Sequence, residues 1–181
     1  MSNLRRDLIL WSDTLQDFHL PRWEELPNFD LYLDQVITLI EGYLQNLFDE
    51  ENDTILTAAM INNYVKLKLI PKAEKKRYNR MHIAYLIAIT ILKQVLTISE
   101  VKGIEYQAGI NGLKEAFNLF CEEQEAAIKA VADHLKNQDS TFLLEGITVQ
   151  NTAIKMATMS FAGKLVAEKI LHLQNSYTAR L

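Results

Sequence analysis

The sequence predicts an all-α protein, and three observations lead to this fold class. The 181 residues include only six glycines and three prolines, so long stretches are free of helix breakers. Strong helix formers such as Leu, Ala, Lys and Glu are frequent, and apolar residues recur at steps of three and four. Hydrophobic residues make up 49% of the chain, which is enough for a packed core. We expect a helical domain over residues 1–103, with its core in residues 30–103, followed by a helical hairpin over residues 104–181.

Two amphipathic helices are expected in the first quarter of the chain. Residues 4–18 place Leu, Trp and Phe side chains at helical spacing, and residues 33–47 repeat this pattern with Leu, Val and Ile. Asn28 or Asp30 is a suitable cap for the second helix, because a short polar side chain accepts bonds from the first free backbone N–H groups. Each helix therefore has one face suited to a core and one suited to water.

A third helix is expected over residues 57–68, and it precedes a helix that is apolar on all sides. Thr57 is a suitable N-cap for the third helix, and Pro71 ends it because a proline ring prevents the helix from continuing. Residues 83–92 are almost entirely apolar, with Asn79 placed to cap their helix. A helix without a polar face is usually buried, so residues 83–92 are the predicted centre of the fold.

Positive charge gathers between these two helices, although the net charge of the chain is −4. Residues 66–80 carry seven basic side chains and one acidic one, whereas residues 1–65 carry three basic and twelve acidic ones. Residues 72–78 are too charged for a core and are expected to form an exposed hairpin or loop. Most charged runs are simply solvated, but this one directly follows a helix with a polar face, which favours an anion-binding surface.

Asparagine and lysine on the polar side of helix 57–68 make duplex DNA the preferred anion. An Asn side chain donates to and accepts from the edge of adenine, and Lys and Arg neutralise phosphates. We expect a DNA interface made of helix 57–68 and a basic stretch over residues 72–80. Its predicted contact residues are Asn62, Asn63, Lys66, Lys68, Lys72, Lys75, Lys76, Arg77, Tyr78 and Arg80.

The same residues resemble known families. Thr57-x-x-Met60-Ile61-x-x-Tyr64, followed by Leu69-Ile70-Pro71, resembles the recognition helix and turn of MerR-type winged-helix regulators. Lys76-Arg77-Tyr78, followed by Ile83, Leu86 and Ile89, resembles the wing and next helix of that family, over residues 54–103 in all. Lys68 stands where MerR-type proteins place a glycine. The resemblance implies a MerR-like winged helix-turn-helix with a short basic wing.

A more specific resemblance covers residues 25–105. Four stretches are similar to an uncharacterised bacterial family called domain of unknown function 1836: DLYLDQV (30–36), MINNYVK (60–66), KKRYNRMHIAYLI (75–87) and LKQVLTISEV (92–101). This resemblance implies a helical architecture related to the MerR type, and it implies no activity.

The last part of the chain carries an apolar repeat of seven residues. Its spacing is typical of a helix that packs along another helix. A second apolar line, formed by Ile154, Phe161 and Leu165, is available to pack on the same chain while the first meets a second copy. We therefore predict a homodimer with an interface made of Val149, Met156, Met159, Val166, Ile170 and Leu173.

No pattern indicates an enzyme, a metal site, a cofactor or a membrane span. The four histidines lie far apart without metal-ligand spacing, and Cys121, the only cysteine, is expected to be a small buried hydrophobe. The longest apolar run is far shorter than the ~20 residues of a spanning helix, and the N-terminus lacks a signal peptide pattern. We predict a cytoplasmic, DNA-binding transcriptional regulator. The alternative is a non-catalytic adaptor that uses the same scaffold to bind an acidic protein partner.

Overall fold

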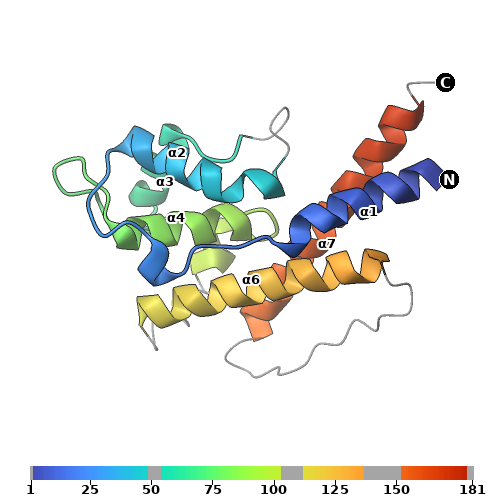
Figure 1. The fold of residues 1–181 in the computed structure, drawn as a ribbon. Helices are drawn as coiled ribbons and strands as arrows, with labels where there is room; N and C mark the ends of the chain where they lie inside the picture. The colour runs from blue at the N-terminus through green and yellow to red at the C-terminus, as the bar shows by residue number, and fades with distance from the viewer. Residues whose placement is uncertain (1, 49–53, 103–111, 137–151, 179–181) are drawn as a thin grey trace. The chain divides into compact units, whose positions relative to one another are not determined.

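The structure is a computed structural model that describes residues 2–48, 54–102, 112–136 and 152–178 (Figure 1). Within these ranges the regular secondary structure is helical, and β-pairing is limited to two isolated bridges, which confirms the all-α fold class. The chain forms two compact units, one made of Met1–His19 with Glu123–Leu181 and the other of Leu20–Glu122. The main helices are α1 (Ser2–Gln16), α2 (Leu33–Leu44), α3 (Ala58–Lys66), α4 (Arg80–Leu92), α6 (Leu113–Lys136) and α7 (Thr152–Thr178), with 3-10 turns at Trp23–Glu25 and Gln45–Leu47.

Helix α4 is the centre of the unit Leu20–Glu122, as the sequence predicted. Nine of its side chains are buried, and they lie on all sides of the helix. Asn79 caps it, because the Asn79 side-chain oxygen accepts a hydrogen bond from the His82 backbone N–H at 3.3 Å. Helix α2 packs against both α3 and α4 and buries Val36, Ile40 and Leu44 on one face. Burial of this apolar surface supplies most of the stability of the unit.

The start of α2 differs from the sequence-based prediction. We expected Asn28 or Asp30 to cap this helix, but the capping position is Tyr32, whose backbone N–H donates to the Gln35 side chain at 2.9 Å. Leu31 is the reason, because both of its backbone groups pair with Tyr78 at 2.8 Å in an isolated antiparallel bridge. A residue held in an extended pairing cannot belong to the first helical turn, so α2 begins later.

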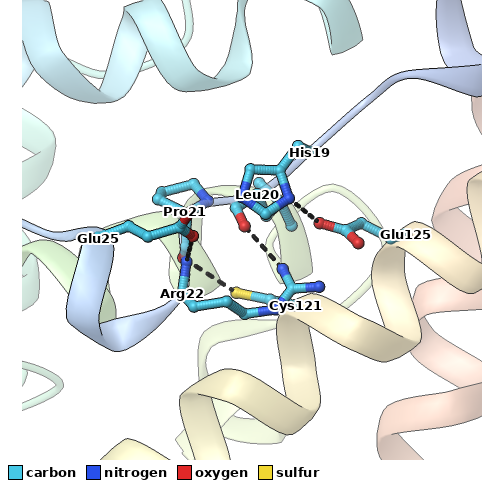
Figure 2. A network of polar contacts seen from close by, with 7 residues as sticks. All are labelled: His19, Leu20, Pro21, Arg22, Glu25, Cys121 and Glu125. Atoms are coloured by element: carbon cyan, nitrogen blue, oxygen red, sulfur yellow. Dashed lines mark hydrogen bonds and ion pairs between the residues drawn. The ribbon is translucent and has the colours of Figure 1, made fainter.

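The segment before α2 is held by contacts within the same unit. The Cys121 thiol, buried as expected, donates to the Pro21 carbonyl at 3.7 Å, and the Arg22 backbone N–H donates to the Glu25 carboxylate at 2.6 Å (Figure 2). The Trp23 backbone N–H donates to the Asn118 side chain at 2.8 Å. These contacts attach the beginning of the unit to the first part of α6.

The other unit combines α1, the second part of α6 and α7. Helix α1 packs along α7. The Lys155 ammonium pairs with Glu123 at 2.6 Å and the Gln124 amide reaches the Thr158 carbonyl at 3.5 Å, so α6 and α7 pack together as expected for the C-terminal helices. His19 Nδ1 lies 3.1 Å from a Glu125 carboxylate oxygen (Figure 2). This grouping differs from the predicted division at residue 103, because α1 joins the C-terminal helices.

Candidate nucleic-acid interface

Helix α3 has one buried side and one polar, exposed side. Thr57 caps it as predicted, since its hydroxyl oxygen accepts from the Met60 backbone N–H at 3.1 Å. Ile61 and Tyr64 are buried against the core, and this orientation leaves two amides and one ammonium in solvent: Asn62, Asn63 and Lys66. The structure thus brings these three predicted contact residues onto one exposed side of a helix.

Lys68 ends α3 in a conformation that favours glycine. Its φ angle is 58°, in the left-handed region. The Lys68 backbone N–H donates to Val65 at 3.0 Å, and the Leu69 N–H donates to Tyr64 at 2.9 Å, which together form a Schellman motif. The side chain at this position of the motif is exposed, so it adds a cation directly beside the end of α3.

The basic segment, residues 66–80, contains a tight two-residue turn over residues 74–77, here called the basic turn. Its central residues, Lys75 and Lys76, have φ angles of 47° and 64°, and the Arg77 N–H donates to the Glu74 carbonyl at 2.7 Å. Positive φ at both central positions defines a type I′ turn, the type that joins two antiparallel strands most tightly. Both lysine side chains are exposed at its tip.

Tyr78 anchors the basic turn in the core. Its backbone pairs with Leu31, its ring is 6% exposed, and burial raises the pKa of its phenol above the usual value. The ring of Tyr78 also contacts the ring of His82 edge to face, with centroids 5.4 Å apart. Tyr78 was among the predicted DNA contacts, but the structure removes its ring from the exposed surface because the turn needs an apolar anchor.

His82 lies below the basic turn in a buried position. Its Nδ1 lies 3.2 Å from the Asn79 backbone nitrogen and 2.7 Å from the Asn79 side-chain oxygen, so both polar groups of Asn79 surround one ring nitrogen. Burial lowers the pKa of His82, an effect partly opposed by the nearby carbonyls of Pro71 and Lys72 and by the carboxylates of Asp30 and Glu74. These two carboxylates also offset part of the positive charge near the turn.

The two arginines of the basic segment are held against aromatic rings. The Arg77 guanidinium carbon lies 3.7 Å from the centre of the Tyr32 ring, and the same guanidinium donates to the Tyr32 hydroxyl at 2.7 Å. Arg80 lies 5.9 Å from the centre of the Trp23 ring, and its Nε donates to the Pro27 carbonyl at 3.4 Å. Both arginines are half-buried, so their orientation is restricted.

The lysines of the basic segment differ from its arginines in their exposure and side-chain contacts. All five are exposed, and within the described ranges none of their ammonium groups forms an ion pair or a hydrogen bond: Lys66, Lys68, Lys72, Lys75 and Lys76. The acidic residues 49–53, which could have masked them, lie outside those ranges. Free ammonium groups retain their full ability to displace counterions from a polyanion.

Tyr32 is the member of this surface that sequence reasoning missed. It lies 45 residues before Arg77, and a single backbone bridge between Leu31 and Tyr78 brings them together. One bridge creates no alternation of polar and apolar residues, so the pattern search had no period to detect. The one signal in the sequence for this contact is Tyr32 itself, an aromatic residue directly before an amphipathic helix.

The predicted dimer residues lie on α7 and are half-buried. This applies to Met156, Met159, Val166, Ile170 and Leu173, whereas Val149 lies outside the described residues. The side chains that α7 buries within its own unit are different ones, namely Ala157, Thr158, Phe161, Ala162 and Leu165. Phe161 and Leu165 belong to the second apolar line, which was expected to pack on the same chain.

In the part of the chain that the structure describes, no group of three His, Cys, Asp or Glu side chains is close enough to hold a metal ion. None of the described helices is both long and apolar enough to cross a membrane.

The compact unit that carries this surface matches a known protein family. The family described as Domain of unknown function (DUF1836) matches residues 21–120, which confirms the resemblance to that family but does not bear on the resemblance to MerR-type regulators. No curated protein and no solved structure matches the chain. The matched residues coincide closely with the compact unit Leu20–Glu122, which contains α3, the basic turn and α4. Because the match covers more than half of the 181 residues, the protein belongs to the DUF1836 family.

Proposed function

We propose that the protein is a cytoplasmic DNA-binding transcriptional regulator without catalytic activity, which contacts duplex DNA through α3 and the basic turn. The single observation that carries this proposal is the set of five exposed lysines, whose ammonium groups have no partner among the described residues, beside the exposed amides of Asn62 and Asn63. Lysines at this density suit a phosphate backbone, and the amides on the adjacent helix suit base edges. In this arrangement the lysines supply affinity and α3 supplies sequence preference.

Backbone conformation gives the proposal independent support. The described non-glycine residues with positive φ are Lys68, Lys75 and Lys76, all exposed and all in the basic segment. Glycine or asparagine is the less strained choice at each position, because a lysine Cβ collides with backbone in the left-handed region. The presence of a cation at a strained position supports a role for the charge rather than for the fold.

A MerR-like winged helix-turn-helix is part of the proposal. In this reading α3 is the recognition helix and the basic turn is a short wing. The supporting observations are the order of the elements and the tight type I′ turn between α3 and the buried α4. The proposed wing lies on the phosphate backbone beside the groove that α3 enters.

Binding to duplex DNA across a range of salt concentrations tests the proposal. The wild-type chain is titrated into fluorescent 30-base-pair duplexes at 50 to 200 mM salt, and contacts with five or six phosphates weaken binding by roughly three orders of magnitude over this range. The variant Lys75→Ala/Lys76→Ala/Arg77→Ala should bind more weakly, with a salt slope that is smaller by about one per cation removed.

A matched control keeps the change in net charge the same. Arg5→Ala/Lys102→Ala/Lys129→Ala removes one arginine and two lysines that are exposed and lie outside the basic segment. This control should bind as the wild type does. If both triple variants lost the same DNA affinity, the loss would reflect the net charge of the chain and not the basic segment. If the wild type did not bind duplex DNA at 50 mM salt, DNA binding would be rejected and the adaptor favoured.

We also propose that two copies pair through α7. The supporting observation is that the seven-residue stripe Met156, Met159, Val166, Ile170 and Leu173 stays half-buried while a neighbouring line packs within the unit. A pair of symmetric copies would place two basic turns on successive half-sites of a duplex. Light scattering at micromolar concentration should give about twice the 20.8 kDa chain mass, and a Met159→Glu/Val166→Glu variant should give the monomer mass.

A further inference from the structure

The backbone pairing of Leu31 with Tyr78 determines what lies on the outer side of the basic turn. In an antiparallel pair, successive side chains point to opposite faces, and residues flanking a paired position stand opposite each other. Leu31 and Tyr78 are both buried. Their neighbours Tyr32 and Arg77 must then face outward as a cross-strand pair, and the two side chains are in contact there.

The contact restrains Arg77 in two ways. Its guanidinium stacks on the Tyr32 ring at 3.7 Å, which restricts the plane of the group. One N–H donates to the Tyr32 hydroxyl at 2.7 Å, which restricts rotation within that plane. An arginine has five N–H donors, so the donors not used by Tyr32 remain available for a second, planar acceptor. Tyr32 is 48% exposed as a residue, which places the pair at the surface.

We propose that Tyr32 is a positioning residue that holds Arg77 ready to bind a DNA phosphate with two parallel hydrogen bonds. This inference rests on the proposed function and adds a residue from a different part of the chain to it. Lys75 and Lys76 lie on the same turn and act as mobile point charges, whereas Arg77 provides directed donors. Because Tyr32 immobilises the guanidinium in the free protein, less freedom is lost when DNA binds.

Binding by Tyr32 variants tests this role, since they leave the charge of the protein unchanged. Tyr32→Ala should weaken duplex binding by roughly two- to tenfold, the equivalent of one long side chain that has to be immobilised on binding. Tyr32→Phe keeps the stacking surface and should recover most of that loss. Tyr32→Leu keeps bulk without a π face and should resemble Tyr32→Ala. Phe29→Ala, which removes another exposed aromatic side chain from the segment before α2, should bind like the wild type.

A double-mutant cycle separates positioning from direct contact and from a fold defect. In an Arg77→Ala background, Tyr32→Ala should cause no further loss, because the group it orients is absent. Equal losses in both backgrounds would overturn the positioning role and indicate that Tyr32 touches DNA or supports α2. Unchanged binding of Tyr32→Ala in the wild-type background would overturn it as well.

Two further outcomes distinguish this inference from its alternatives. A phosphate acceptor predicts the same loss for Tyr32→Ala on duplexes of different sequence, whereas a loss confined to some sequences would show that Arg77 reads a guanine edge instead. The wild-type titration separates the two proposals, because a wild-type chain that does not bind duplex DNA rejects the proposed function itself. A wild type that binds, with Tyr32 variants that bind equally well, rejects only the role of Tyr32.

Discussion

Helix α4 and the basic turn are neighbours in the chain, but they differ in how well their residues suit the local backbone conformation and burial. Helix α4 has a side-chain cap, nine buried side chains and backbone angles throughout the usual helical range. The basic turn places exposed lysines at two positions with left-handed φ angles, and Lys68, a few residues earlier, repeats this choice. The backbone conformation and burial of the first stretch favour a stable fold, whereas the second stretch places lysines in a backbone conformation that disfavours them.

This difference indicates where functional residues of this chain are best sought. Sequences are usually consistent with their structures at every level, and departures concentrate where another requirement competes with stability. A left-handed non-glycine residue costs about 1 kcal/mol, so three of them are a sizeable fraction of a marginal stability of about 5–15 kcal/mol. We therefore expect mutations in the two stretches to change stability in opposite directions.

The largest expected effect is a loss of stability from a cavity in α4. Ile87→Ala should lower the free energy of unfolding by about 2–5 kcal/mol, because Ile87 is fully buried and its neighbours relax only in part. Lys72→Ala, at an exposed position of the basic segment, should change it by less than about 0.5 kcal/mol. Urea unfolding followed by circular dichroism measures both, and similar losses in the two variants would contradict the comparison.

The second largest expected loss of stability comes from removal of a helix cap. Asn79→Ala should destabilise the chain by about 1 kcal/mol, because the His82 backbone N–H loses its acceptor at the buried start of α4. Asn79→Asp retains an acceptor oxygen and serves as the control in the same urea experiment. A loss as large for Asn79→Asp as for Asn79→Ala would show that the amide, and not the cap, matters at this position.

In the basic segment we expect a substitution that increases the stability of the chain. Lys68→Gly should raise the free energy of unfolding by roughly 0.5–1 kcal/mol, because relief of left-handed strain exceeds the greater freedom of glycine in the unfolded chain. The control is Lys66→Gly in the last turn of α3, where glycine should destabilise. If Lys68→Gly were destabilising, the strain argument for the basic segment would be wrong.

The smallest expected effect is a loss of stability at acidic pH. The pKa of His82 is lower in the folded chain than its usual value of 6.5, so the unfolded chain binds more protons between these two pKa values. The contribution of neutral His82 is therefore fully present above about pH 6.5 and is lost as the pH falls through the folded pKa. A His82→Gln variant should lose less stability than the wild type between pH 7.5 and pH 5.5. Parallel curves for the two proteins would exclude His82 as a source of acid sensitivity.

Local features of the fold could be predicted from the sequence. Thr57 and Asn79 act as caps, and the apolar run of α4 is buried on all sides. These features depend on residues a few positions apart, where spacing and side-chain chemistry carry the information. The exposed amides and lysines of the candidate interface follow from the same local reasoning.

Long-range pairings could not be predicted in this way. The bridge between Leu31 and Tyr78 moves the start of α2, buries Tyr78 and joins Tyr32 to Arg77, yet it involves one residue on each side. The association of α1 with α7 likewise depends on tertiary contacts between helices that are individually ambiguous. Amphipathic helices indicate that a face is buried, but they do not say against which partner.

The central claim is that the lysines of the basic turn are present for a polyanion at some expense of stability. The most direct test is the duplex DNA affinity of Lys75→Asn/Lys76→Gly, which installs the preferred type I′ sequence while removing both cations from the tip of the turn. We predict a chain that is more stable than the wild type and binds duplex DNA more weakly, with a smaller salt slope. A chain that is more stable and binds DNA with unchanged affinity would contradict the account.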